Sequence, residues 1–118
     1  MDFHFPHIEP ILPPGHIETV WHHLGDKAAD LKEKLPANHD LTASVILFGG
    51  DEILVETFGY AGPNLLLVNG KRNGNQVSAY VHQSCLQVVF AIVPSSGMKP
   101  KQQFGFVQPE NDSSKEQR

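Results

Sequence analysis

Seven histidines, one cysteine and a few carboxylates are the residues of this chain that could support metal or acid–base chemistry. The histidines are His4, His7, His16, His22, His23, His39 and His82. No two of them have the i, i+4 spacing of a strong helical zinc motif, and His22 and His23 point to different sides of a helix. We therefore expect no metal site, unless His4 and His7 converge with others after folding.

The carboxylates and the cysteine do not form a catalytic pattern. Glu52 and Glu56 fall on the outward face of a predicted strand, where charged side chains are expected. Cys85 is the only cysteine, so no disulfide can form within one chain. It lies three residues from His82 without an activating third group, and we interpret it as a half-buried, unreactive thiol. We expect no enzymatic activity and no cofactor.

The composition is that of one small globular domain. The chain has 118 residues, of which 40% are hydrophobic and 19% are charged. This length is enough for one modest core. No stretch approaches the roughly 18 consecutive apolar residues that a membrane helix needs, and the first six residues lack the features of a secretory signal. We therefore expect a cytoplasmic protein that does not cross a membrane.

The formal net charge of −4 argues against indiscriminate binding to nucleic acid, because such affinity comes mostly from lysine and arginine. Between residues 35 and 94 the only such side chains are Lys71 and Arg72. They lie within a predicted turn, which is usually solvated, although in an assembly they could touch phosphate. Any contact with nucleic acid must be local.

Patterning divides the chain into an arm, a domain and a tail. Residues 1–15 contain four prolines and are expected to form an extended arm. Apolar residues recur at spacings of three and four over 16–35, which predicts an amphipathic helix that Pro36 ends. Gly25-Asp26 is expected to divide this helix, with Asp26 capping its second half.

Short β-rich runs follow the helix. We expect strands near 43–48, 52–58, 64–69, 77–82 and 86–93, separated by glycine- and asparagine-containing turns at 49–51, 59–63 and 69–76. Five short antiparallel strands can cover a core by curling into a small barrel or by packing on the helix. The predicted domain is 16–94. Residues 95–118 form a predicted polar tail, apolar only at 104–107 and expected to be disordered beyond that point unless a partner orders it.

The segment from Val45 to Leu67 resembles the first motif of the Sm/LSm/Hfq family, in which a strand, a glycine turn, a long bent strand and an Asn-Leu-x-Leu strand follow in order. The matching residues are Val45, Leu47, Gly50, Gly59, Tyr60, Asn64, Leu65 and Leu67. Gly50 would permit the first turn, Gly59 the bend, and Leu65 and Leu67 would point into the core. Residues 81–89 correspond more weakly to the second motif, and the resemblance is to a divergent, phage-type member.

The resemblance implies a mainly β fold, an Sm-like, five-stranded, strongly bent antiparallel small barrel with an N-terminal helix. The first part of the barrel and its last strand would be open edges, and identical copies would pair edge to edge into a homo-oligomeric ring. Turns at Gly62-Pro63-Asn64 and His82-Gln83 would then surround a central pore in the family's RNA-binding position. Asn64 would contact a base edge or support the loop, and His82 would stack on or bond the base.

Two kinds of function follow from this resemblance. The chain could bind single-stranded RNA through the two turns, with Lys71 and Arg72 as further candidates at the phosphates. Alternatively, the ring could serve as a structural or protein-interaction module without RNA, which the acidic balance favours. A small barrel enzyme or metal binder is the third class, and it would require bound metal.

Overall fold

The N-terminal part of the described chain is one uninterrupted helix. The computed structural model describes residues 16–95 and 100–108. Helix α1 spans Ile17–Glu33. His16 caps its start, because the His16 Nδ1 atom accepts a hydrogen bond from the Glu18 backbone N–H at 3.1 Å. An N-cap acceptor of this kind satisfies one of the backbone donors that every helix start leaves unpaired.

The predicted division of this helix at Gly25-Asp26 is wrong. A glycine within a helix costs only about 1 kcal/mol relative to alanine. Trp21 and Ala28, on either side of it, are both buried in the same core cluster, so both halves of α1 pack on the same body.

No helix of the described residues is long and apolar enough to cross a membrane.

Seven strands follow α1 in the described residues, and the prediction of a mainly β chain with one N-terminal helix is confirmed. They are β1 (His39–Ile46), β2 (Glu52–Ala61), β3 (Leu65–Arg72), β4 (Asn75–His82), β5 (Val88–Pro94), β6 (Lys101–Gln102) and β7 (Gly105–Phe106). Two short 3₁₀ turns, η1 (Phe48–Gly50) and η2 (Gln83–Cys85), join β1 to β2 and β4 to β5. The five predicted strands overlap with β1 to β5.

The turn between β3 and β4 is much shorter than predicted. It contains only Asn73 and Gly74, with φ of 54° and 81°, instead of the eight residues 69–76. Two successive positive φ angles are the signature of the tight hairpin turn whose twist matches that of the flanking strands. The ladder therefore continues to the pair Arg72 and Asn75.

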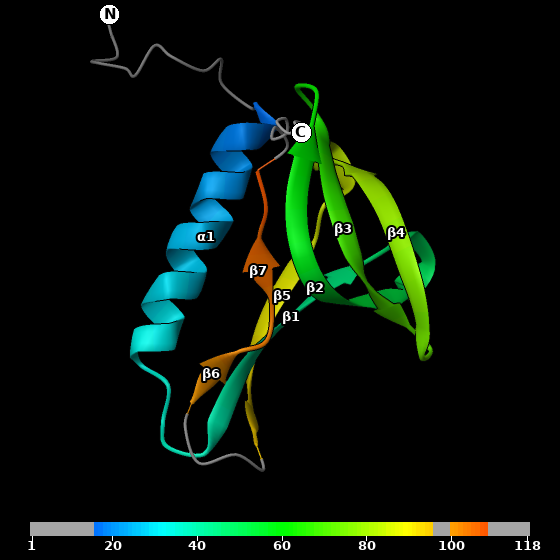
Figure 1. Cartoon of the computed structure of the whole chain (residues 1–118). Helices are drawn as coiled ribbons and strands as arrows, with labels where there is room; N and C mark the ends of the chain where they lie inside the picture. Colours follow the sequence, from blue (N-terminus) through cyan, green and yellow to red (C-terminus); the bar gives the residue numbers. More distant parts are fainter. Residues whose placement is uncertain (1–15, 96–99, 109–118) are drawn as a thin grey trace, which may run out of the picture.

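The strands form one bent sheet in the order β4-β3-β2-β1-β5 (Figure 1). Neighbours along this path are antiparallel. The prediction of a five-stranded barrel needs correction, because β6 and β7 add to the sheet and, within the described residues, β4 and β5 do not pair with each other. The sheet is consequently open at β4 and at β5.

Residues 100–108, which we call the C-terminal strap, fill the gap where β1 and β2 separate. These strands pair with each other only over Ser44–Ile46 and Glu52–Leu54. Farther from this contact, β6 pairs in parallel with the start of β1, and β7 pairs in parallel with Thr57 and Phe58 in the middle of β2. The packed part of the chain therefore extends beyond the predicted boundary at residue 94. The predicted arm at 1–15 and residues 109–118 of the predicted tail lie outside the described residues.

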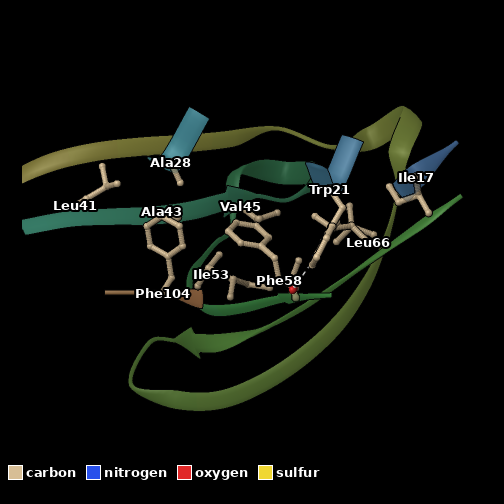
Figure 2. Packing of buried hydrophobic residues seen from close by; sticks show 13 residues of the cluster. Ile17, Trp21, Ala28, Leu41, Ala43, Val45, Ile53, Phe58, Leu66 and Phe104 are labelled. Atoms are coloured by element: carbon tan, nitrogen blue, oxygen red, sulfur yellow. Dashed lines mark hydrogen bonds between the residues drawn. The ribbon is translucent and has the colours of Figure 1, made fainter. Parts of the chain in front are cut away.

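The core lies between α1, the sheet and the strap (Figure 2). Its centre is Phe58, which is fully buried and stacks on Phe106 with ring centroids 5.2 Å apart. The Trp21 Nε1–H donates to the Phe58 carbonyl oxygen at 3.0 Å, drawn as the dashed line in Figure 2. Phe104 of the strap lies with its ring centroid 5.9 Å from that of Phe58. Helix, sheet and strap thus meet at one aromatic cluster.

The predicted core face of β3 is wrong by one residue. Leu66 and Val68 are completely buried, whereas Leu65 and Leu67 are only partly buried and lie on the opposite face. The prediction that Glu52 and Glu56 face outward is confirmed, since both are exposed. The irregularity in the β2–β3 pairing falls between Val55 and Thr57, before the predicted bend at Gly59.

Candidate functional site

The two turns that the sequence singles out lie together at one end of the sheet. We call residues 62–64 and 82–83 the turn pair. The Gln83 N–H donates to the Asn64 carbonyl oxygen at 2.9 Å, and the Gln83 Nε2–H donates to Asn64 Oδ1 at 3.2 Å. Gly62 takes a φ of 57°, a left-handed conformation that glycine adopts without strain. The Pro63 carbonyl oxygen accepts the Ile17 N–H at 2.8 Å, which attaches the turn to the start of α1.

The turn pair leaves several polar groups available at an exposed surface. Asn64 and His82 are exposed, and Gln83 is half-buried. Among the described residues, no hydrogen bond uses Asn64 Nδ2 or Gln83 Oε1. One amide donor and one amide acceptor therefore remain side by side, the combination that reads a base edge.

His82 also has a structural role. Its Nδ1 atom accepts the Ser84 N–H at 3.1 Å and lies 2.9 Å from Ser84 Oγ, so His82 caps the η2 turn. Because Nδ1 accepts a backbone N–H, the neutral ring carries its proton on Nε2. Cys85, predicted to be half-buried, is exposed, with its Sγ 3.8 Å from Ser84 Oγ.

Lys71 and Arg72 do not join the turn pair. They lie at the opposite end of β3, next to the Asn73-Gly74 turn. Lys71 Nζ is 3.9 Å from a Glu56 carboxylate oxygen, and Arg72 Nη1 is 3.6 Å from an Asp51 carboxylate oxygen. Exposed ion pairs of this kind contribute about 0–1 kcal/mol. Both cations are thus partly neutralised and remote from the two turns.

The histidines and carboxylates of the described chain do not assemble into a metal centre. No group of three or more His, Cys, Asp or Glu side chains in residues 16–95 and 100–108 lies close enough to hold a metal ion. His22 and His23 are both exposed on α1, and His22 Nε2 lies 3.5 Å from a Glu18 carboxylate oxygen. His4 and His7 lie outside the described residues.

A groove that sequence reasoning missed lies on the face of β2, β3 and β4 opposite to the core. This sheet-face groove has a volume of about 260 Å³, and its lining includes Thr57, Gly59, Leu67, Asn69, Tyr80 and Val107. The strand register places Gly59, Leu67 and Tyr80 in one row across the sheet, and Thr57, Asn69 and Ser78 in the next row. In the sequence, the alternation Ser78-x-Tyr80-x-His82 indicates that these three residues share one face of a strand, because residues two apart on a strand point the same way.

Strand β4 presents an unpaired backbone edge. The Gln83 N–H points toward β3, where it donates to Asn64. Hydrogen-bonding direction alternates along an antiparallel strand. The backbone groups of Ser78, Tyr80 and His82 therefore point away from β3, and no strand of the described residues pairs with them.

Strand β5 presents the second unpaired edge. The Ser95 N–H donates to the Asn38 carbonyl oxygen at 2.9 Å, in register with the β1–β5 ladder. By the same alternation, the backbone groups of Phe90 and Ile92 point away from β1. Val89 and Ile92 are 48% and 42% exposed. This edge is therefore apolar as well as unpaired in the described part of the chain.

The two edge strands lack charged side chains. Monomeric proteins usually protect edge strands with charged side chains. Neither β4 (NQVSAYVH) nor β5 (VVFAIVP) contains a Lys, Arg, Asp or Glu. The prediction that the first part of the barrel is open needs correction, because β1 lies between β2 and β5. The strands at the ends of the sheet order, unpaired on one side by any described strand, are β4 and β5.

The described residues thus combine a polar turn pair, a neutral groove and two unpaired sheet edges. Comparison of the chain with models of protein families, with curated proteins and with solved structures found no match.

Proposed function

We propose that this chain assembles into a ring of the Sm type and binds single-stranded RNA at the turn pair. The observation that carries the proposal is the sheet order β4-β3-β2-β1-β5, which ends on two uncharged edge strands. Pairing β4 of one copy with β5 of the next is a heterologous contact, which generates a ring when the rotation closes. An N-terminal helix followed by a long second strand with an irregular register agrees with the Sm resemblance.

The RNA part of the proposal is supported by the chemistry of the turn pair. Asn64 and Gln83 offer an amide donor and an amide acceptor, and His82 offers an exposed ring. Sequence-specific RNA recognition uses such contacts to unstacked bases. One weak site per subunit, repeated around a ring, gains affinity through multivalency.

A ring that binds protein partners instead of RNA is the second candidate. It is favoured by the placement of Lys71 and Arg72, which pair with carboxylates at the end of β3 remote from the turn pair. In that case the chain would form the same oligomer without affinity for RNA. Both candidates therefore predict the same oligomer, and a measurement of RNA binding distinguishes them.

Asn64→Ala is expected to weaken RNA binding about tenfold, or ~1.4 kcal/mol, because it removes one amide contact to a base. The measurement is fluorescence anisotropy with labelled oligouridine and oligoadenine RNA. Affinity should fall only gently with rising salt, since few phosphates are neutralised when the site contains no lysine or arginine.

The matched control is Asn75→Ala, an exposed asparagine beside the Asn73-Gly74 turn at the other end of the sheet. It should leave the affinity for RNA unchanged. If wild-type protein binds neither RNA at low salt, the RNA proposal fails, and a retained oligomer would then favour the protein-interaction ring.

Ser78→Pro is expected to convert the oligomer into a 13.0 kDa monomer. Proline removes the Ser78 N–H, which points out of the β4 edge, and it leaves the ladder between β3 and β4 intact. Light scattering coupled to size-exclusion chromatography measures the mass, and circular dichroism checks the fold.

Ser78→Ala is the matched control for this substitution. It also removes the Ser78 hydroxyl, which donates to Asn69 Oδ1, but it keeps the backbone donor. The control should retain the mass of the wild type. Equal masses for a folded Ser78→Pro variant and the wild type would exclude β4 as the assembly edge.

A further inference from the structure

We propose that the sheet-face groove binds one nucleobase of the RNA strand, stacked against the ring of Tyr80. This inference rests on the proposed function and adds a second contact point to it. Tyr80 is 64% exposed, whereas its neighbours on the strand, Ala79 and Val81, are half-buried and buried. An aromatic ring exposed on a sheet face is a platform on which bases stack.

The groove has space for a flat group beside Tyr80. Gly59, Leu67 and Tyr80 form one row across three strands. Gly59 is buried at the bottom of the groove, and a Cβ atom added there would be in ordinary contact, 3.5 Å from the Val107 carbonyl oxygen and 3.7 Å from Leu67 Cβ, so glycine leaves only the space of a methyl group at this point. Val107 is held there by its N–H, which donates to the Phe58 carbonyl oxygen at 2.8 Å.

The neighbouring row supplies polar groups in a fixed orientation. Asn69 Nδ2–H donates to Thr57 Oγ1 at 3.1 Å, and Ser78 Oγ–H donates to Asn69 Oδ1 at 2.5 Å. One N–H of the Asn69 amide and the hydroxyl proton of Thr57 remain for a ligand. The acceptor atoms on the edge of a base stacked on Tyr80 would face these two donors.

The absence of charge selects the class of ligand. None of the described residues that line the groove is a lysine, arginine, histidine, aspartate or glutamate. An anion such as phosphate, or a metal ion, would lose its hydration there without gaining a counter-charge. An uncharged planar ring loses little hydration and gains stacking.

The groove is continuous with the turn pair. Ala61, Leu65 and His82 form the next row of the same face, directly beside Asn64 and Gln83. A strand bound at the turn pair can therefore continue along β4 to Tyr80. Edge pairing of β4 uses backbone groups in the plane of the sheet, so the face of the groove stays accessible in the proposed ring.

The test compares oligouridine and oligoadenine binding by wild type, Tyr80→Ala and Tyr80→Phe. Tyr80→Ala should weaken binding about tenfold, whereas Tyr80→Phe, which keeps the ring, should bind as the wild type does. Gly59→Val is the second variant, because its methyl groups would occupy the bottom of the groove. Leu54→Ala, at an exposed apolar residue on the other part of β2, is the control. The mass of each variant is measured in parallel.

A second probe separates this inference from the proposed function. Adenosine, with ribose 5-phosphate as the base-free control, is titrated into isotope-labelled full chain while the amide resonances of Gly59, Leu67 and Val107 are followed. RNA binding that is equal in wild type, Tyr80→Ala and Gly59→Val overturns the groove and leaves the turn pair standing. Shifts of these resonances by adenosine alone, without RNA binding, support the groove and remove the RNA proposal. If neither RNA nor adenosine produces a response, both the groove inference and the RNA proposal are overturned.

Discussion

Replacing Gly70 with alanine is expected to lower the free energy of unfolding by about 3 kcal/mol or more. Gly70 is buried in β3 and pairs with Val55 where the β2–β3 register shifts. A Cβ atom there would lie 2.0 Å from the Leu54 carbonyl oxygen and 3.0 Å from Val55 Cα. Both are backbone atoms, so no side-chain rotation can relieve the overlap, and β2 and β3 would have to separate.

Gly25→Ala in α1 is the matched control, because nothing lies within 4 Å of the added Cβ atom. It should raise the free energy of unfolding by about 0.5–1 kcal/mol, through the better helix propensity of alanine. Urea unfolding followed by circular dichroism measures both variants. A Gly70→Ala protein as stable as the wild type would mean that β2 and β3 do not approach each other in this way.

Phe104→Ala is expected to destabilise the fold by about 3–5 kcal/mol, the usual cost of truncating a buried phenylalanine. Phe104 is 6% exposed and packs with Phe58, Phe90 and Phe106, with ring centroids 5.6–5.9 Å apart. It lies in the C-terminal strap, outside the domain that patterning predicts. Loss of the Phe104 ring should therefore unfold more than the strap, because the cluster of rings to which it belongs also holds α1 and β2 together.

The control in the strap is Val107→Ala, since Val107 is 50% exposed. This change should cost no more than about 1 kcal/mol. Thermal unfolding of both variants is followed at one protein concentration, because assembly makes the midpoint depend on concentration. A Phe104→Ala protein with the stability of the Val107→Ala protein would show that the strap is dispensable.

The helix and the strands β1 to β5 could be predicted from the sequence because each has a strong local signal. Apolar residues at spacings of three and four specify α1, and Gly49 and Gly50 take the positive φ values of 88° and 94° that the first turn needs. The length of the third turn could not be predicted. Every residue from Asn69 to Gln76 is polar or glycine, so none of them marks a strand. Only the pairing across the hairpin decides that Asn73-Gly74 is the turn.

The strap and the core face of β3 depend on tertiary contacts. Strands β6 and β7 have two residues each, too few to show any periodicity. Leu65 to Val68 are four apolar residues in succession, so alternation cannot tell which two face the core. In the structure Leu66 and Val68 face the core, and on the other face Asn69 bonds with Thr57 and Ser78.

The candidate site was predictable only where the family resemblance covers it. That resemblance pointed to Asn64, His82 and Gln83, which the structure brings together. It could not show that Lys71 and Arg72 lie at the opposite end of β3, because this follows from the length of the ladder. The sheet-face groove depends on the position of Val107 beside Gly59, a contact between segments far apart in the sequence.

The mass of the purified full chain, measured by light scattering over a range of concentrations, tests the assembly most directly. Two uncharged edges that complete each other predict one species at a whole-number multiple of 13.0 kDa, stable on dilution. A folded protein that stays at 13.0 kDa at the highest concentration would contradict the ring and, with it, the multivalent RNA site.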